Sequence, residues 1–379
     1  MRVAVITESF LPTVNGVTTS VCRVLDHLRA SGHQALVITP SAGAPAKYLG
    51  FPVHEVPALA YRRFPVGLPT PALQGILSDF VPDVVHAASP FLLGAQGIAA
   101  ARRLGVPSVA VYQTDVARYA ARHGLSAATG LAWRMVRRAH ENADLTLVPS
   151  SAAMHDLEAA GVQRLARWGR GVDTALFTPN RRTAPGTAEL RQRLSPFGEV
   201  VVGYVGRLAP EKQLERLSAL RGLRGITIAV VGEGSSRATL ERSLRGMPVA
   251  WLGQRSGTNL AEAYAALDLF VHTGTEETFG QTLQEAHASG VPVVAPAAGG
   301  PIDLVAHGVD GLLFDPADAD AQLRAGVATL VEDAELRRRM GEAGRRKVRT
   351  RTWDVLCDEL VGHYTAAIRG RQAVPSASL

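Results

Sequence analysis

The chain has 379 residues, too many for one ordinary hydrophobic core, so we expect two domains. Hydrophobic residues make up 46% of it and charged residues 20%, which is the balance of a folded soluble protein and excludes a disordered chain. The formal charge of +6 indicates anionic partners, such as phosphates or acidic lipid headgroups. No nucleic-acid motif accompanies this charge, so we expect no nucleic-acid partner.

Cysteine usage and the start of the chain predict a cytoplasmic location. Cys22 and Cys357 form no spacing motif, which indicates a reducing compartment and no metal site. Residues 3–6 form an apolar strand directly after the first two residues, so we expect no signal peptide. No apolar run approaches the length of a membrane span.

The first elements predict the start of a doubly wound α/β domain. An apolar strand at residues 3–6 leads through a loop into a helix at 17–30, and a second strand follows at 35–39. Gly16, at the entry of this helix, either lets the backbone approach a phosphate or serves as an ordinary turn glycine. The loop lacks the G-x-G-x-x-G pattern and no acidic residue ends the second strand, so a nicotinamide cofactor is not expected.

Polar residues follow a later strand of the same domain. The strand at residues 106–112 ends in Gln113, Thr114 and Asp115, and active sites form at the carboxyl ends of parallel strands. The Gln113 amide cannot act as a base, so it would position a substrate rather than move a proton. Asp115 is a candidate acid for binding an acceptor, and its alternative is a helix N-cap.

Two basic and aromatic stretches raise the alternative of contact with a membrane surface. Residues 61–65 read Tyr-Arg-Arg-Phe-Pro, and the helix at 125–143 carries Trp133 and Arg134. An exposed loop and an amphipathic surface helix are the favoured interpretations. Peripheral contact with an anionic membrane is the alternative that remains open.

A Pro-, Arg- and Thr-rich segment at residues 179–196 predicts a linker with a short helix, and a second domain begins after it. Its first strand, at residues 200–205, runs into Gly206 and Arg207. Pro210 fits the first position of a new helix, which puts Lys212 in the first turn. A cation there is disfavoured by about 0.3–1 kcal/mol unless an anion binds beside it. We therefore predict a phosphate site at Arg207 and Lys212, with ordinary surface cations as the alternative.

The most informative stretch surrounds Glu277. An apolar strand at residues 267–271 precedes it, and a helix opens after Gly280 and ends near residue 290. The open amides at such a helix start bind anions. Glu277 lies just before this start and Glu285 lies inside the helix, so two acceptors for hydroxyl groups flank an anion site. A nucleotide sugar has hydroxyls at both ends and phosphates between them; capping carboxylates are the alternative.

The spacing Glu277-x7-Glu285, with Phe279-Gly280 inside it, resembles the Glu-x7-Glu motif of retaining glycosyltransferases of family 4. This resemblance implies two Rossmann-like α/β domains facing across a cleft, the GT-B architecture. Their expected extents are residues 1–178, with a C-terminal helix at 353–370 packing back on them, and residues 199–352. It also implies that Glu277 contacts the donor sugar and Glu285 the ribose.

The family resemblance extends to the other motifs. The implied donor-binding residues are Gly16, Gly206, Arg207, Lys212, Gly232, Leu252, Glu277, Thr278, Phe279, Gly280, Gln281 and Glu285. The implied catalytic residues are Glu277, Arg207, Lys212, Gln113 and Asp115. Many relatives carry His where this chain has Gln113, which argues against a role for a histidine base at that position. Because cations would stabilise the departing diphosphate, we expect neither a metal nor a cofactor other than the nucleotide-sugar substrate.

The first loop, at residues 12–17, and residues 112–115 look most like those of GDP-mannose-dependent α-mannosyltransferases acting on lipid or glycan acceptors. The resemblance thus implies retaining transfer of mannose by a cytoplasmic enzyme, with peripheral attachment to the inner face of the cell membrane as the alternative location. A transferase using UDP-glucose or UDP-N-acetylglucosamine, a sugar-nucleotide epimerase and a non-catalytic binding protein are the alternatives.

Overall fold

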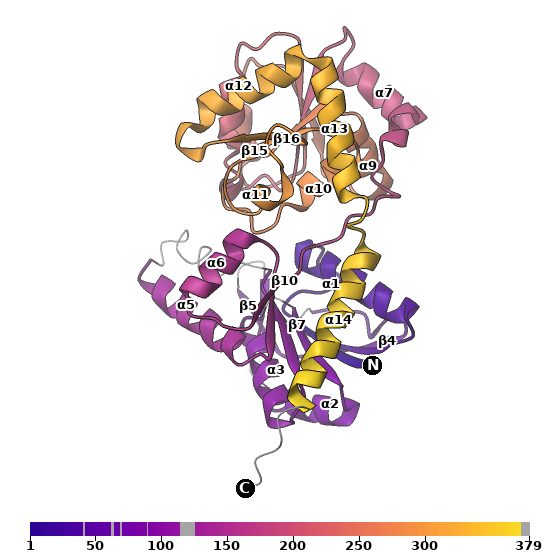
Figure 1. The fold of residues 1–379 in the computed structure, drawn as a ribbon, viewed down its shortest axis with the longest axis vertical. Helices are drawn as coiled ribbons and strands as arrows, with labels where there is room; N and C mark the ends of the chain where they lie inside the picture. The colour runs from indigo at the N-terminus through magenta and orange to yellow at the C-terminus, as the bar shows by residue number, and fades with distance from the viewer. Residues whose placement is uncertain (41, 62–63, 69, 89, 114–125, 373–379) are drawn as a thin grey trace. The chain divides into compact units, whose positions relative to one another are not determined.

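The computed structural model describes the chain except residues 41, 62–63, 69, 89, 114–125 and 373–379. It divides into two compact units (Figure 1). Unit 1 comprises Met1–Gly169 and Asp354–Leu379, and unit 2 comprises Arg170–Trp353. Within the described residues, no helix combines the length and apolar character needed to cross a membrane.

Unit 1 is built on an eight-stranded sheet in the order β10-β9-β8-β7-β1-β2-β4-β3, parallel except for the pair β3–β4. Its strands are β1 Arg2–Thr7, β2 Gln34–Thr39, β3 Lys47–Tyr48, β4 Phe51–Glu55, β7 Val84–Ala88, β8 Ser108–Val111, β9 Leu145–Val148 and β10 Leu165–Arg167. Its helices are α1 Gly16–Ala30, α2 Ala72–Phe80, α3 Leu92–Arg103, α5 Ser126–Glu141, α6 Ser151–Ala159 and α14 Trp353–Gln372. The predicted opening of strand, loop, helix and strand is confirmed.

The sequence did not reveal the structure between β2 and β7. That stretch holds the short strands β3 and β4, the antiparallel hairpin of β5 Ala58–Tyr61 and β6 Phe64–Gly67, and helix α2. The hairpin is short and its second strand contains a proline, so its local pattern resembles an irregular loop.

The last helix, α14, is anchored to unit 1 by buried polar contacts. The Nδ1 atom of His86, on β7, lies 2.6 Å from the Tyr364 hydroxyl, and the Trp168 indole donates a hydrogen bond to the Leu356 carbonyl at 2.6 Å. The Nε2 atom of His27, on α1, lies 3.1 Å from the Asp358 carboxylate of α14. Helix α1 lies beside α14 in Figure 1. Burial lowers the pKa of His86, in the middle of β7, to about 4, so this histidine is neutral and serves packing.

Unit 2 contains a six-stranded parallel sheet in the order β13-β12-β11-β14-β15-β16. The strands are β11 Val200–Val205, β12 Ile226–Val231, β13 Val249–Gly253, β14 Leu269–Val271, β15 Val293–Pro296 and β16 Gly311–Phe314. The helices are α7 Pro185–Leu194, α8 Arg237–Ser243, α9 Gly257–Ala265, α10 Gln281–Ala288, α11 Pro301–Leu304, α12 Ala319–Glu332 and α13 Ala334–Val348, and 3-10 turns span Pro179–Thr183, Pro210–Lys212, Leu214–Leu220 and Pro316–Asp318.

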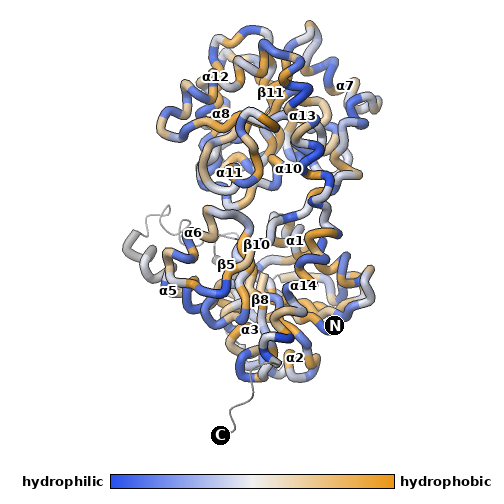
Figure 2. Tube along the Cα trace, viewed as in Figure 1, coloured by the Kyte–Doolittle hydropathy of each residue, from blue (hydrophilic) through white to orange (hydrophobic). Residues whose placement is uncertain are grey.

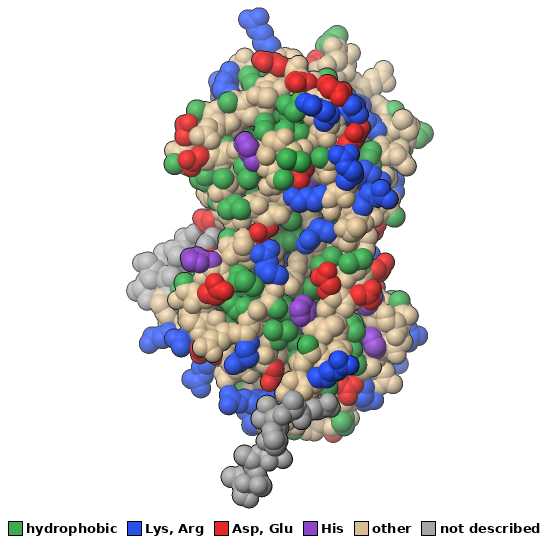
Figure 3. All heavy atoms as spheres, viewed as in Figure 1, with side chains coloured by type: hydrophobic (Ala, Val, Ile, Leu, Met, Phe, Trp, Pro, Cys, Tyr) green, Lys and Arg blue, Asp and Glu red, His purple; other side chains and the backbone are tan. Residues whose placement is uncertain are grey.

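Both faces of this sheet are buried, as parallel sheets require. On β11, Val201 and Val205 pack into one apolar cluster, whereas Val202 and Tyr204 pack into the cluster on the other face. The strands are accordingly hydrophobic and the outer turns of the helices hydrophilic (Figure 2). Lys and Arg side chains gather on the face that carries α13 (Figure 3), where Arg338 pairs with Glu335 and Glu342.

The boundary between the units differs from the expected one. Residues 170–178 were assigned to the first domain, but the structure places them in unit 2. Val172 forms a parallel bridge with Thr352, and the Phe177 ring packs edge-on against Tyr264. The segment carries only isolated apolar residues, so its pattern does not reveal which core these residues join.

Candidate functional site

The two strongest predicted residues, Lys212 and Glu277, meet in unit 2. The Lys212 Nζ atom lies 2.6 Å from Oε2 of Glu277, and both side chains are largely buried. The neighbouring backbone holds them in place, since the Thr273 hydroxyl donates to the Lys212 carbonyl at 2.6 Å. Gln213 also donates to the Thr275 hydroxyl at 3.2 Å. A turn after β11 and the loop after β14 therefore form one site at the carboxyl ends of neighbouring strands.

The helix predicted around Lys212 is wrong. Residues Pro210–Lys212 form a single 3-10 turn, and Gln213 follows with a left-handed backbone at a φ of 49°. The left-handed residue ends the turn before a regular helix can propagate. No α-helix dipole therefore acts on Lys212, and the carboxylate of Glu277 is what balances its charge.

Arg207, the second predicted cation, lies on the loop before the same turn. Its guanidinium pairs with the Glu211 carboxylate, and its side chain remains 66% exposed. The Tyr204 hydroxyl donates to the Arg207 carbonyl at 3.1 Å, which fixes the backbone of the loop from inside the sheet. Both cations thus have carboxylate partners, but only Arg207 presents most of its surface to solvent.

The charge state of Glu277 is set by its neighbours. Burial acts to raise its pKa, but the positive charge of Lys212, with a smaller contribution from Arg170, outweighs burial and holds the pKa at about 2. The carboxylate is therefore ionised at neutral pH. Such a group can accept hydrogen bonds from sugar hydroxyls and stabilise a nearby positive charge.

A pair of glycines supports the loop that carries Glu277. The Gly300 amide donates to the Glu277 carbonyl at 2.7 Å. A Cβ atom on Gly300 would lie 2.1 Å from the Phe279 carbonyl oxygen, and one on Gly299 would lie 2.5 Å from the Glu277 carbonyl oxygen. The turn before α11 can approach the Glu277 loop this closely only because it lacks side chains.

We expect Gly300→Ala to displace this loop and to lower the stability of the protein by about 1–3 kcal/mol, because overpacking against backbone cannot be relieved by a rotamer change. The measurement is the free energy of unfolding in urea. The control is Gly362→Ala on α14, where no atom lies within 4 Å of the added Cβ. Equal stability of the two variants would contradict the close packing.

Helix α10 begins where the sequence predicted. Gly280 is its N-cap with a left-handed backbone at a φ of 105°, and no side chain caps this end within the described residues. Thr278 and Phe279 lie in the preceding loop, and Gln281 is the first helical residue. Because the helix opens without a capping side chain, its first amides can receive an anion.

Glu285, inside α10, accepts a hydrogen bond from the Tyr264 hydroxyl at 2.9 Å. Burial raises its pKa to about 7, although hydrogen bonds from Tyr264 and Gln281 act to lower it. Sequence reasoning missed Tyr264, because an aromatic residue on the apolar face of α9 is normally read as core. Its ring does belong to the core, and only its hydroxyl reaches the site.

The remaining predicted residues of unit 2 are packed closely against neighbouring backbone or against the core. A Cβ atom on Gly232 would lie 1.9 Å from the Gly206 carbonyl oxygen, so these two glycines let the ends of β11 and β12 approach. Leu252 is partly buried and packs against the core. Sequence reasoning also missed Arg170, whose charge acts on Glu277 and whose carbonyl accepts a hydrogen bond from Gln284 at 2.8 Å.

In unit 1, Gly16 is the first residue of α1, but the amides behind it are already engaged. The Asn15 side chain accepts from Val17 at 2.9 Å and from Thr18 at 3.0 Å. The Asx signature of a helix N-cap was present in the sequence and identifies Asn15. Gln113 follows β8 and is 9% exposed, whereas Asp115 lies outside the described residues.

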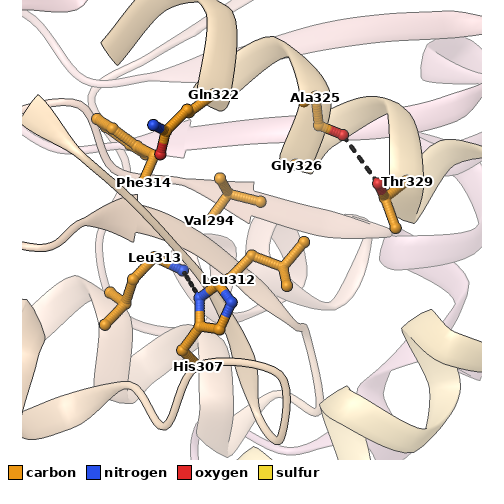
Figure 4. Close-up of a pocket in the computed structure, with 9 residues that line it drawn as sticks. All are labelled: Val294, His307, Leu312, Leu313, Phe314, Gln322, Ala325, Gly326 and Thr329. Atoms are coloured by element: carbon orange, nitrogen blue, oxygen red, sulfur yellow. Dashed lines mark hydrogen bonds between the residues drawn. The ribbon is translucent and has the colours of Figure 1, made fainter. Parts of the chain in front are cut away.

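A separate hollow of about 220 Å³ lies between β16 and α12, away from the predicted residues (Figure 4). Its polar groups are already engaged. His307 accepts from the Leu313 amide at 3.0 Å, Gln322 from the Asp315 amide at 2.8 Å, and Thr329 donates to the Ala325 carbonyl at 3.0 Å. Among the described residues, no group of three or more His, Cys, Asp or Glu side chains could hold a metal ion.

Comparison with known proteins extends over the whole chain. The model of Glycosyltransferase Family 4 matches residues 14–176, and that of Glycosyl transferases group 1 matches residues 187–347. The GDP-mannose-dependent alpha-mannosyltransferase of Mycolicibacterium smegmatis is 50% identical over 386 residues, covering 100% of both chains. The protein of the same name from Corynebacterium glutamicum is 42% identical over 384 residues, covering 99% of this chain and 91% of the relative.

Solved structures share the fold. Anabaena Alr3699/HepE in complex with UDP-glucose matches with a TM-score of 0.77 at 22% identity, covering 97% of this chain and 100% of that one. At this level of sequence identity, the similarity shows a shared fold and nothing about function. The predicted pair of doubly wound α/β domains, as in the GT-B architecture, is confirmed.

Proposed function

Because the chain belongs to the family 4 glycosyltransferases, we propose that it transfers mannose from GDP-mannose to a lipid or glycan acceptor with retention of the anomeric configuration. The choice of donor is supported by relatives that are named GDP-mannose-dependent alpha-mannosyltransferases and are 42% to 50% identical along the chain. The UDP-sugar and epimerase alternatives have no comparable support.

The observation that carries this proposal is the contact between Lys212 and Glu277. Departure of GDP leaves negative charge on a diphosphate, and Lys212, Arg207 and the first amides of α10 would stabilise that charge. Removal of one such donor commonly costs about 2.7–4 kcal/mol of transition-state free energy. Glu277 would hold the hydroxyls of the sugar and stabilise positive charge developing at its anomeric carbon.

The rest of the proposed site follows the family pattern. Glu285 would accept the ribose hydroxyls, and the loops at Gly232 and Leu252 would frame the base. These groups would suffice without a metal or a further cofactor. In unit 1, Gln113 and Asp115 would position the donor sugar and the acceptor, and Gly16 would approach the donor.

A lipid acceptor would bring the enzyme to the inner face of the cell membrane. Helix α5 supports this part of the proposal, because Arg134, Arg137 and Arg138 are exposed there and Met135 is 37% exposed. Arginines beside an apolar side chain suit an anionic lipid surface.

The proposal is tested by a thermal-shift panel of GDP-mannose, UDP-glucose, UDP-N-acetylglucosamine and the free diphosphates, followed by transfer assays. GDP-mannose should raise the melting temperature most, and NMR of the product should report an α-linkage. A larger increase in melting temperature with a UDP-sugar would identify that sugar nucleotide as the donor instead. Isomerised sugar formed without an acceptor would indicate an epimerase.

Donor binding should depend on pH through Glu285. The ionised carboxylate accepts hydrogen bonds from the ribose hydroxyls, so GDP affinity should rise as the pH passes through about 7. Tyr264→Phe removes the hydrogen bond that lowers the pKa of Glu285. The pH at which GDP affinity rises should therefore increase by about one unit, which is the size of effect expected for one charge-assisted hydrogen bond. Calorimetric titration at several pH values measures the shift.

Glu285→Gln serves as the control for that titration. It should bind GDP more weakly and without the rise near neutral pH, because the amide does not ionise. A rise that persists in Glu285→Gln would assign the pH dependence to another group.

A further inference from the structure

His272 is a buried histidine beside the site with no assigned role. It follows β14 directly and is 2% exposed. Among the described residues, no hydrogen-bond partner lies at either ring nitrogen. Burial lowers its pKa to about 4, although Glu277 and the Gly274 backbone act in the opposite direction. The imidazole is therefore neutral at pH 7 and carries its proton on one nitrogen.

In this state the neutral imidazole ring is destabilised by a buried polar group that lacks a hydrogen-bond partner. When Nε2 carries the proton, that N–H group is buried without a hydrogen-bond acceptor, which costs about 1–3 kcal/mol. A packing residue of the same shape, such as Phe, would avoid this cost. The unpaired N–H is explained if it finds an acceptor in another state of the site.

Geometry identifies that acceptor as Glu277. The His272 Nε2 atom lies 3.8 Å from Glu277 Oε2, just beyond hydrogen-bond distance. The Lys212 Nζ atom already lies 2.6 Å from the same oxygen and pairs with it. The two donors therefore converge on one carboxylate oxygen, and in this state only the lysine is bonded to it.

The surrounding backbone restricts which of these groups can move. A Cβ atom on Gly274 would lie 2.9 Å from the Glu211 carbonyl oxygen, so the loop after His272 packs tightly on the turn that carries Lys212. The Glu277 loop is held by Gly300. Of Lys212, Glu277 and His272, the lysine can adapt most, because its ammonium sits on a flexible four-carbon chain.

We propose that His272 is a positioning residue that takes over the Glu277 carboxylate when Lys212 turns to the donor diphosphate. This inference rests on the proposed function, because the diphosphate is what draws the lysine away. Movement of Lys212 would leave Glu277 Oε2 without its cation as the sugar arrives. A hydrogen bond from His272 Nε2 would then keep the carboxylate oriented towards the sugar while leaving its charge intact.

The first test requires no donor. Full-length protein with ¹⁵N-labelled histidine is compared as wild type and Lys212→Met, with His272→Gln used for assignment. Removal of the lysine should allow His272 to bond Glu277, giving a downfield-shifted, slowly exchanging ring proton that the wild type lacks and that Lys212→Met/Glu277→Ala loses. An unchanged His272 signal in Lys212→Met would overturn the inference whatever the donor is.

The second test measures transfer kinetics with GDP-mannose. His272→Phe keeps the ring but removes the donor, and kcat should fall about 10- to 100-fold with little change in KM, the loss expected for one hydrogen bond to a charged group. His272→Gln retains an N–H and should recover most of that loss. Equal losses in both variants, or none in His272→Phe, would overturn the positioning role. An inactive wild type would instead refute the proposed donor and leave the first test standing.

Discussion

Glu277→Gln should lower kcat/KM for mannosyl transfer by about 10²- to 10³-fold, the loss expected when one preorganised electrostatic contact to the transition state is removed. The carboxylate is ionised, with a pKa of about 2, and lies 2.6 Å from Lys212. The amide keeps the shape and still accepts a hydrogen bond from the lysine, but it offers no charge to a developing oxocarbenium ion. Steady-state kinetics with GDP-mannose measures the loss.

An exposed acid of the same unit supplies the control for that experiment. Glu215→Gln removes one exposed carboxylate and should retain activity within about threefold, because surface substitutions usually cost little. Melting temperatures of both variants distinguish lost chemistry from lost folding. Wild-type rates in Glu277→Gln would remove the basis for the proposed site.

The parts of the site that the sequence revealed are those in which one short stretch carries the signal. Glu277 and Glu285 sit on either side of a helix start, and the helix begins after Gly280 as predicted. The strand before Arg207 is likewise evident from its apolar run. Local periodicity and turn chemistry determine such features, so a single sequence contains enough information to find them.

Features that depend on tertiary packing were not accessible in this way. Tyr264 lies on a different helix from Glu285, and the sequence of α9 does not indicate that the tyrosine hydroxyl will contact a carboxylate. The turn at Lys212 is a 3-10 turn because Gln213 adopts a left-handed backbone that its residue type does not require. Residues 170–178 join unit 2 through a bridge to Thr352, a contact across the length of that unit.

The pairing of Lys212 with Glu277 could not be inferred from their motifs either. Each motif separately predicts a donor contact, whereas the structure shows that in this state the two side chains satisfy each other. At the proposed site, donor binding would therefore replace an existing ion pair rather than fill two vacant positions. The variants of these two residues should consequently behave as a coupled pair rather than as independent contacts.

Lys212→Met should lower kcat by about 10²- to 10³-fold and weaken the thermal shift caused by GDP, because the methionine keeps the length of the side chain without the charge that meets the diphosphate. It should also raise the pKa of Glu277, since Lys212 is the foremost group that lowers it. In the wild type, the lowered pKa of Glu277 contributes stability that is present above the pKa of an unfolded glutamate and is lost as the pH falls towards 2. In Lys212→Met that contribution should be smaller at neutral pH and should disappear at a higher pH than in the wild type.

The double variant Lys212→Met/Glu277→Gln separates coupling from simple addition. Each single variant leaves the other residue without its ionic partner, so the double variant should lose less activity and less stability than the sum of the two single losses. Arg224→Met removes an exposed cation of the same unit and should leave both activity and GDP binding unchanged. Strict additivity of the two losses would mean that the lysine and the glutamate act on the donor independently, and the ion pair seen between them would then have no part in the reaction.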